Sequence, residues 1–476
     1  MSNINHIQGK KGIELLKNLQ GIDYENVLVV AIDPAKHFPK ALICNFNGEI
    51  IYKPFFFHID KSGLNSFLNK IQNADKEIMA QKVLIGTEAT GHYHQKVVHF
   101  LQEKNYEVSI INPYTTSEIR KQNLIRSKND NFDLFAIAKA ITENKITESY
   151  LSEGVYKKLL QLTRNRRHEV NNLSRIKAKI RTFMDHIWPN FQGESKLATK
   201  NNNNKTIAKI FSDFWGKSSV CIMDNCPHPT QVLKLGYEGL KNLSKKHKLK
   251  MRSTTIDKLL NAAKNAYTQP PENLEFEIIM LKKKIEDYYH TKEQISFLNE
   301  KLEELLVKTP GILLLSIPGI SKTIAAEFTA ELGPIKHYNH AKQAIKNAGT
   351  NPVVKESGGK NPNYGSISKQ GNPKFRKIVY LAGKSLKQHN PYFEHFANRL
   401  ESKGKTGKQI NIACGNKFIK IAFAMLTKKE FFHPPKWEGK PLTHNVYKKI
   451  EDDDNIVEAR KTLVKELELG QEKFIS

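Results

Sequence analysis

The chain has 476 residues, which is enough for two or three domains. Its 75 Lys and Arg outnumber its 48 Asp and Glu, so the formal net charge is +27 and favours a polyanionic partner. No apolar run approaches the roughly 18 residues that cross a bilayer, and four cysteines do not make a disulfide framework. We therefore expect nucleic acid as the partner, no membrane, and a cytoplasmic location in the cytosol or on the nucleoid.

Residues 1–24 are expected to form a polar leader, and residues 25–150 have the pattern of an α/β domain. Apolar, β-branched runs predict strands at 27–32, 41–44, 50–57, 83–85 and 108–111, with Asn47-Gly48 as a hairpin turn. Helices are predicted near 64–71, 94–103 and 132–143. Three strands with a hairpin, followed by alternating helix and strand, are the order expected of an RNase H-like α/β domain.

Residues 151–310 are predicted to be helical. Residues 154–187 combine an apolar stripe at 3–4 spacing with many Arg and Lys, which suits either a helix along a phosphate backbone or a solvated surface helix. Apolar residues then repeat in heptads over 274–305, which predicts a coiled coil of roughly 48 Å. This rod could join two copies of the protein or fold against another helix of its own chain, and we favour self-association.

Residues 311–433 are expected to be mostly α-helical, and 434–476 form a charged tail. Ser316-Ile317-Pro318-Gly319-Ile320, followed by a helix over 323–332, has the character of a helix-hairpin-helix. In such a motif backbone amides contact DNA phosphate, and the glycine permits close approach. A loop is predicted over 355–371, rich in Gly, Ser, Asn and Lys, and it leads into a basic helix.

Four acidic residues carry the clearest chemical signal, namely Asp33, Glu88, Asp130 and Asp133. Asp33 and Glu88 end the first and fourth predicted strands, and the two others lie on one face of a helix start. If those strands are neighbours, all four meet at one edge of the sheet. Converging carboxylates are what two Mg²⁺ ions need to cut a phosphodiester. Taken singly, each of these residues is more typical of a turn or a helix cap than of a metal site.

Several short segments carry a resemblance. They are Ala31-Ile32-Asp33, Thr87-Glu88-Ala89-Thr90-Gly91-His92-Tyr93, Ile111-Asn112-Pro113, Lys128-Asn129-Asp130-Asn131-Phe132-Asp133, Ser316-Ile317-Pro318-Gly319-Ile320, Ala348-Gly349-Thr350-Asn351-Pro352, Glu356-Ser357-Gly358 and Ser368-Lys369-Gln370-Gly371-Asn372. In this order and spacing the sequence resembles the bridge-RNA-guided, DEDD-motif transposases of bacterial insertion sequences, the IS110 group, which is related to the Piv-type DNA invertases.

The resemblance implies a RuvC-like metal-binding domain at 25–150, a helical and coiled-coil linker at 151–310, and a C-terminal transposase domain at 311–433. It implies that Ser357 is a nucleophile that forms a phosphoserine link to DNA, in a composite site where the carboxylates hold Mg²⁺. The implied partners are donor and target DNA, an element-encoded bridge RNA that pairs with both, and further copies of the protein, as a dimer to tetramer, in the bacterial cytosol.

The residues alone support Ser357 less strongly than the carboxylates. A serine hydroxyl needs a base or metal to become a nucleophile, and a serine before two glycines is typical of a turn. Two other functions fit: a RuvC-like endonuclease that uses metal-activated water, and a non-enzymatic basic RNA-binding protein. The candidate nucleic-acid contacts are Lys128, Arg164, Arg166, Arg167, Gly319, Lys369 and Arg376. Cys221, Cys226 and His228 resemble an incomplete zinc site.

Overall fold

The computed structural model describes residues 19–89, 91, 93–122, 130–143, 154–192, 209–355, 363–430 and 432. The chain divides into two compact units, Met1–Leu151 and Ser152–Ser476, and each is described by itself. Among the helices so described, none has both the length and the apolar character that crossing a membrane requires.

A five-stranded mixed sheet forms the centre of the first unit. Its strands are β1 (Val27–Asp33), β2 (Lys40–Asn45), β3 (Ile50–Phe56), β4 (Lys82–Glu88) and β5 (Val108–Ile111), in the spatial order β3-β2-β1-β4-β5. β1 runs antiparallel to β2, β2 antiparallel to β3, and β1 parallel to β4, which is parallel to β5. The carboxyl ends of β1, β3, β4 and β5 therefore share one edge. The mixed sheet is as predicted, and the first and fourth strands are neighbours.

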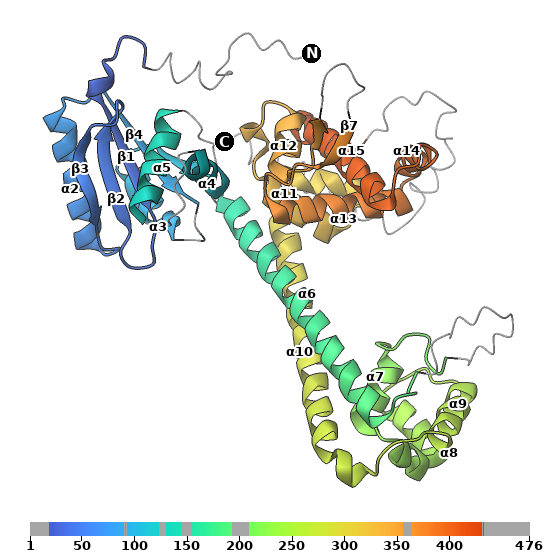
Figure 1. Ribbon diagram of the computed structural model, residues 1–476. Coiled ribbons are helices and arrows are strands. Elements are labelled where there is room, and N and C mark those ends of the chain that lie inside the picture. Colours follow the sequence, from blue (N-terminus) through green and yellow to red (C-terminus); the bar gives the residue numbers. More distant parts are fainter. Residues whose placement is uncertain are drawn as a thin grey trace. The chain divides into compact units, whose positions relative to one another are not determined.

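Helices cover both faces of this sheet because side chains along each strand alternate between two apolar clusters. From β1, Leu28 and Val30 join the cluster under α2 (Lys61–Glu77) and α3 (His94–Glu103), whereas Val29 and Ala31 join the cluster under α5 (Asp130–Thr142). Figure 1 shows α2 on one side of the sheet and α5 on the other. A short 3-10 helix, η1 (Tyr24–Asn26), precedes β1, and α4 (Pro113–Gln122) precedes α5.

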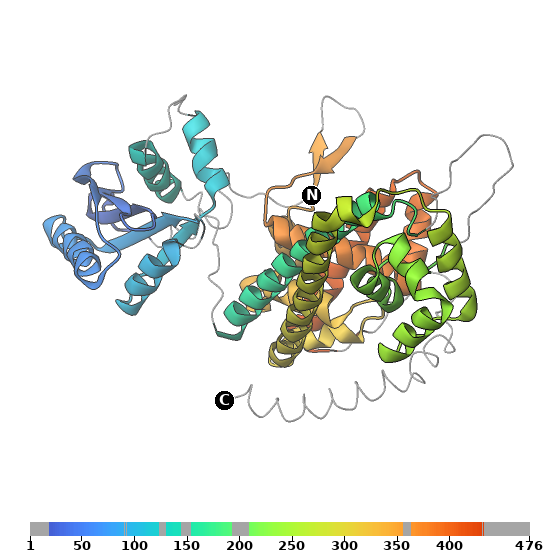
Figure 2. The ribbon, with the colours of Figure 1, turned by 90° about the horizontal axis from the view of Figure 1, so that it is seen from below.

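Two long helices of the second unit, α6 (Gly154–Ile187) and α10 (Glu275–Leu306), lie side by side along much of their length (Figures 1 and 2). The predicted heptad residues Leu281, Ile285, Tyr288 and Leu302 are buried on α10. The heptad stripe therefore packs against a helix of the same chain. The alternative that the rod folds against a helix of its own chain is therefore what the structure shows for these residues, and self-association, the favoured expectation, stays a prediction.

Three shorter helices pack on the ends of this pair, namely α7 (Lys217–Asn225), α8 (Pro229–Lys246) and α9 (Ser253–Lys264). Their apolar residues share one core with Ile180 and Met184 of α6 and with Leu281 of α10. The hydroxyl of Thr268 donates to the carbonyl of Ile187 at 2.7 Å, so the chain returns to the end of α6 before η2 (Pro271–Leu274) leads into α10.

The C-terminal part is a helical cluster that shares a core with the other ends of α6 and α10. Its elements are η3 (Pro310–Ser316), α11 (Lys322–Leu332), η4 (Ile335–His337), α12 (Ala341–Ala348), β6 (Pro352–Lys355), β7 (Asn363–Ile367), α13 (Pro373–His389), α14 (Pro391–Glu401) and α15 (Gly407–Lys428). β6 and β7 form an antiparallel hairpin that projects from the helices in Figure 2. The sequence predicted only a loop there.

Candidate functional site

Two of the predicted carboxylates end neighbouring strands. Ile32 of β1 is in register with Thr87 of β4, so Asp33 and Glu88 come next at the same edge of the sheet. Asp33 continues the alternation of Val29 and Ala31, which face α5. Glu88 is two residues beyond Gly86, where an added Cβ would lie 2.7 Å from the Ile141 side chain of α5. Both carboxylates therefore lie on the α5 face.

Asp133 comes from α5, which packs on β1 and β4. α5 begins at Asp130, and Asp133 follows one turn later with 9% of its surface exposed. The Asp133 carboxylate forms an ion pair with Arg120 of α4. The side chain of Asp130 and the whole of Lys128 lie outside the described residues.

Three neighbouring side chains at this edge were not predicted. The hydroxyl of Thr116, a buried residue of α4, donates to Oε2 of Glu88 at 2.8 Å. Lys40 stands opposite Asp33 in the antiparallel ladder, and its Nζ donates to Oδ1 of Asn131 at 2.8 Å. The third is Arg120. The alternation of β2 could have indicated Lys40, but α4 was not predicted, so its side chains could not be found.

The residues at this edge suit Mg²⁺ in their donor chemistry, because carboxylate oxygens are the hard ligands that this ion prefers. Asp33 and Glu88 lie in register, and Thr116 fixes one oxygen of Glu88. Asp133 is engaged by Arg120. Among the described side chains, no three acidic, histidine or cysteine residues are close enough together to hold a metal. The structure therefore aligns two carboxylates at one edge and holds a third in an ion pair.

The predicted nucleophile belongs to the connection between β6 and β7. The last paired positions of the hairpin are Lys355 and Asn363. Ser357 lies between them, outside the described residues, so its role stays a prediction.

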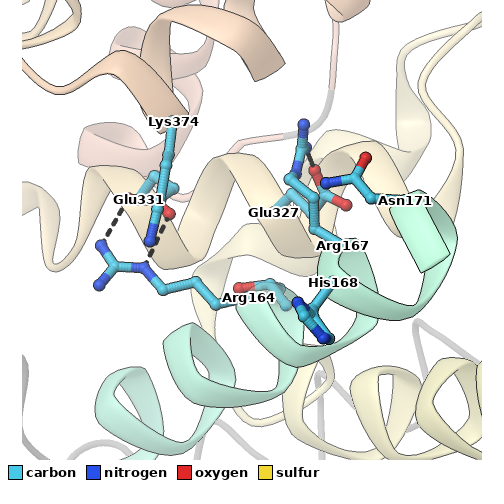
Figure 3. A pocket seen from close by; sticks show the side chains of 8 residues that line it. Arg164, Arg167, His168, Asn171, Glu327, Glu331 and Lys374 are labelled. Atoms are coloured by element: carbon cyan, nitrogen blue, oxygen red, sulfur yellow. Dashed lines mark hydrogen bonds and ion pairs between the residues drawn. The ribbon is translucent and has the colours of Figure 1, made fainter.

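The arginines of α6 form ion pairs within the second unit. Arg164 binds both carboxylate oxygens of Glu331, at 3.2 and 3.1 Å. Arg166 and Arg167 both pair with Glu327, which is 4% exposed. Figure 3 shows the ion pairs of Arg164 with Glu331 and of Arg167 with Glu327. These contacts join α6 to α11 and explain the arginines without nucleic acid, so a phosphate contact by them stays a prediction.

A cavity of about 220 Å³ opens beside these ion pairs, and Lys374 of α13 also lines it. Burial, together with the nearby charge of Arg164, lowers the pKa of Lys374. Positive charge is therefore crowded at this junction even though Glu327 and Glu331 partly compensate it.

Two other candidate contacts, Gly319 and Arg376, have packing roles. Gly319 has φ +91°, which favours glycine, and its carbonyl accepts a hydrogen bond from Ser385 of α13 at 2.7 Å. A 3-10 helix rather than an α-helix precedes this turn, so the structure does not confirm the predicted helix-hairpin-helix. Nη1 of Arg376 donates to the carbonyls of Ala348 and Lys369. A contact of Gly319, Lys369 or Arg376 with nucleic acid stays a prediction.

The incomplete zinc set has a structural explanation. His228 is the N-cap of α8, and its Nε2 lies 3.0 Å from the carbonyl oxygen of Gln269. Cys221 and Cys226 are both buried, and burial raises the pKa of Cys226 to about 12. His228 therefore has a capping role at the start of α8, and zinc binding by this set stays a prediction.

Comparison with known proteins matches both units of the chain. A DEDD transposase model of the IS110 group matches residues 30–189, and the model of the transposase IS116/IS110/IS902 family matches residues 312–398. The first match covers the carboxylate edge and α6. The second runs from within η3 into α14 and includes the β6–β7 hairpin.

Individual relatives agree with these models. The pilin gene-inverting proteins of Moraxella bovis and Moraxella lacunata are each 29% identical over 149 residues, which is 30% of this chain and 46% of theirs. An uncharacterized 44.8 kDa protein of insertion element IS116 from Streptomyces clavuligerus is 20% identical over 237 residues, 48% of this chain and 57% of its own. The chain thus spans about half the length of the curated relatives it matches. The two models together place the chain in the IS110 group of transposases.

Proposed function

We propose that the chain is a DNA transposase that breaks and rejoins donor and target strands. The observation that carries this proposal is the register of β1 and β4, which sets Asp33 and Glu88 side by side on the face that α5 covers. Such an edge suits phosphodiester chemistry, because carboxylate oxygens are the donors that Mg²⁺ prefers and a bound Mg²⁺ assists phosphodiester cleavage.

In this proposal Asp33, Glu88, Asp130 and Asp133 hold Mg²⁺. When bound, the ion neutralises charge on the scissile phosphate and favours an ionised nucleophile. Thr116 holds Glu88 in a fixed orientation through its 2.8 Å hydrogen bond. The Arg120 guanidinium balances the charge of Asp133, and this ion pair would have to open for the carboxylate to bind the ion.

The proposed nucleophile is Ser357. Its hydroxyl oxygen attacks the phosphorus, loses its proton to a base, and expels a sugar oxygen that leaves as a hydroxyl. A phosphoserine ester then joins protein and DNA until a hydroxyl from the partner strand attacks and releases the serine. The Glu356-Ser357-Gly358 segment and its place in the second matched region support this role.

Guidance by an element-encoded bridge RNA, and assembly of a dimer to tetramer, belong to the same proposal. The net charge of +27 supports binding of a nucleic acid, whether DNA or RNA. Lys128, Lys369, Arg376 and the arginines of α6 remain candidate contacts. RNA that co-purifies with the protein would be sequenced, and the absence of a discrete RNA species would remove the guide from the proposal.

The test of the nucleophile compares the parent with Ser357→Ala on donor and target DNA in Mg²⁺. Ser366→Ala is the matched control, because Ser366 is an exposed serine of the same hairpin. We expect the parent and the control to form a protein–DNA adduct that survives denaturing electrophoresis, and Ser357→Ala to form none and to cut nothing.

Cutting by Ser357→Ala, with no adduct in the parent, would instead support the endonuclease that uses water. If alanine at all four carboxylate positions leaves cutting intact, the metal proposal fails. RNA binding with no cutting under any condition would favour the non-enzymatic alternative.

A further inference from the structure

The first unit has a cavity of about 660 Å³ at the edge of the sheet where β1, β3 and β4 end. Its walls come from three segments, each of which follows a strand that ends there: β1, β3 and β4. We call it the edge pocket; the side chains that matter for its chemistry are Lys36, His37, Phe38, His58, Tyr93 and Lys96. Because Asp33 and Glu88 end two of these strands, the pocket and the carboxylates share one edge. Ligands of open α/β sheets bind at such edges.

The edge pocket contains an exposed aromatic side chain, Phe38. Phe38 keeps 53% of its surface exposed, although it lies in a loop only five residues beyond Asp33. Its ring is braced edge-on by His58, with centroids 4.7 Å apart, and His37 lies 6.5 Å from it. A phenyl ring held in this way presents a fixed flat face, which is the shape that a nucleobase stacks on.

The charge of the edge pocket is positive. Lys36 and Lys96 line it, against the single carboxylate of Asp60. That carboxylate already serves as the N-cap of α2: Oδ1 accepts from the Gly63 amide at 2.7 Å and from Ser62 at 2.9 Å. These hydrogen bonds lower the pKa of Asp60 and hold its charge at the start of the helix. The lysines therefore remain to attract an anion such as a phosphate.

We propose that the edge pocket binds one unpaired nucleotide, with its base stacked on Phe38 and its phosphate near Lys36 and Lys96. The proposal deepens the proposed function, because it rests on nucleic acid as the substrate. A base inside a duplex has both faces covered by its neighbours, so the pocket selects a strand that is unpaired at this point. The pocket lies beside the starts of α2 and α3, whereas Asp33 and Glu88 lie on the α5 face of the same sheet edge.

The test measures binding of short single-stranded DNA and RNA oligonucleotides to the full chain, in a buffer with a chelator so that no cutting occurs. Phe38→Leu removes the flat ring and keeps an apolar side chain. Phe276→Leu is the matched control, because Phe276 is 68% exposed on α10, in the other unit. We expect Phe38→Leu to bind about five-fold more weakly or worse, Phe38→Trp to retain affinity, and Phe276→Leu to match the parent.

Salt dependence separates the two contacts. Stacking is uncharged, so Phe38→Leu should leave the slope of log affinity against log salt unchanged. Lys36→Ala and Lys96→Ala should each reduce that slope by about 0.7, the value expected for one single-strand phosphate contact. A fluorescent base analogue in the oligonucleotide should be quenched by the parent and less so by Phe38→Leu.

A loss confined to DNA would assign the pocket to a donor or target strand, and a loss confined to RNA would assign it to an RNA partner; either result supports the proposal. Unchanged binding of both strands by Phe38→Leu, or an equal loss in Phe276→Leu, would overturn it. Since no metal or cutting is involved, the edge pocket can fail while adduct formation through Ser357 stands, and the reverse also holds.

Discussion

Replacing Glu327 with glutamine removes the charge that joins α11 to α6 while keeping the size of the side chain. Glu327 is 4% exposed and pairs with both Arg166 and Arg167. Loss of one partner of a buried ion pair costs about 3–5 kcal/mol, because the remaining charge is left uncompensated. Here the two arginine side chains keep 17% and 18% of their surfaces exposed, so solvent relieves part of the penalty. We therefore expect the free energy of unfolding to fall by about 2–3 kcal/mol.

The assay is urea unfolding followed by tryptophan fluorescence. The three tryptophans of the chain, Trp188, Trp215 and Trp437, all belong to the unit that spans Ser152–Ser476, so the signal reports this unit. Glu331→Gln is the matched control. Its partner Arg164 is 42% exposed and can turn to solvent, so we expect a loss of no more than about 1 kcal/mol.

An opposite result would refute this reasoning. If Arg166 and Arg167 serve mainly to contact phosphate, Glu327→Gln should leave the urea midpoint unchanged and strengthen nucleic-acid binding, because it releases two positive charges. An unchanged midpoint would show that the ion pairs do not hold α11 on α6.

Gly415→Ala should lower the free energy of unfolding by about 1–3 kcal/mol, because the added Cβ would lie 2.5 Å from the carbonyl oxygen of Val379. Gly407→Ala is its control, since a Cβ there meets nothing within 4 Å; equal urea midpoints for the two variants would contradict the close contact of α13 and α15. Thr116→Val should weaken Mg²⁺ binding in calorimetry about ten-fold by releasing Glu88, whereas Thr116→Ser should retain it. Parent-like Mg²⁺ affinity in Thr116→Val would show that this hydroxyl does not orient the carboxylate.

Strand alternation and turn residues were enough to predict the sheet of the first unit. The predicted helix over 94–103 and strand over 108–111 coincide with α3 and β5. α4 was missed because Asn112-Pro113 was interpreted as a loop. Its signal was nevertheless present: proline is common in the first turn of a helix, and Oδ1 of Asn112 accepts from the Tyr114 amide at 2.9 Å.

Other features could not be predicted because they depend on contacts far apart in the sequence. A heptad stripe is the same whether it faces a second copy or α6, so the partner of α10 was open. The basic stretch of α6 gave no indication of Glu327 and Glu331, which lie about 160 residues further on. The β6–β7 hairpin was missed because its strands are short and the sequence around them is rich in turn residues.

The hydrogen bond from Thr268 to Ile187 brings together the two ends of the segment between these residues. Everything between these residues leaves the end of α6 and returns to the same place, so to the rest of the protein this segment is topologically an insertion. A segment of this kind can be lengthened, shortened or exchanged at little cost in loop-closure entropy. Any replacement segment has to meet one local requirement. It has to cover the apolar side chains of Ile180, Met184 and Leu281, which belong to this core. The paired helices thus offer a position where new binding specificity can be added without rerouting the chain.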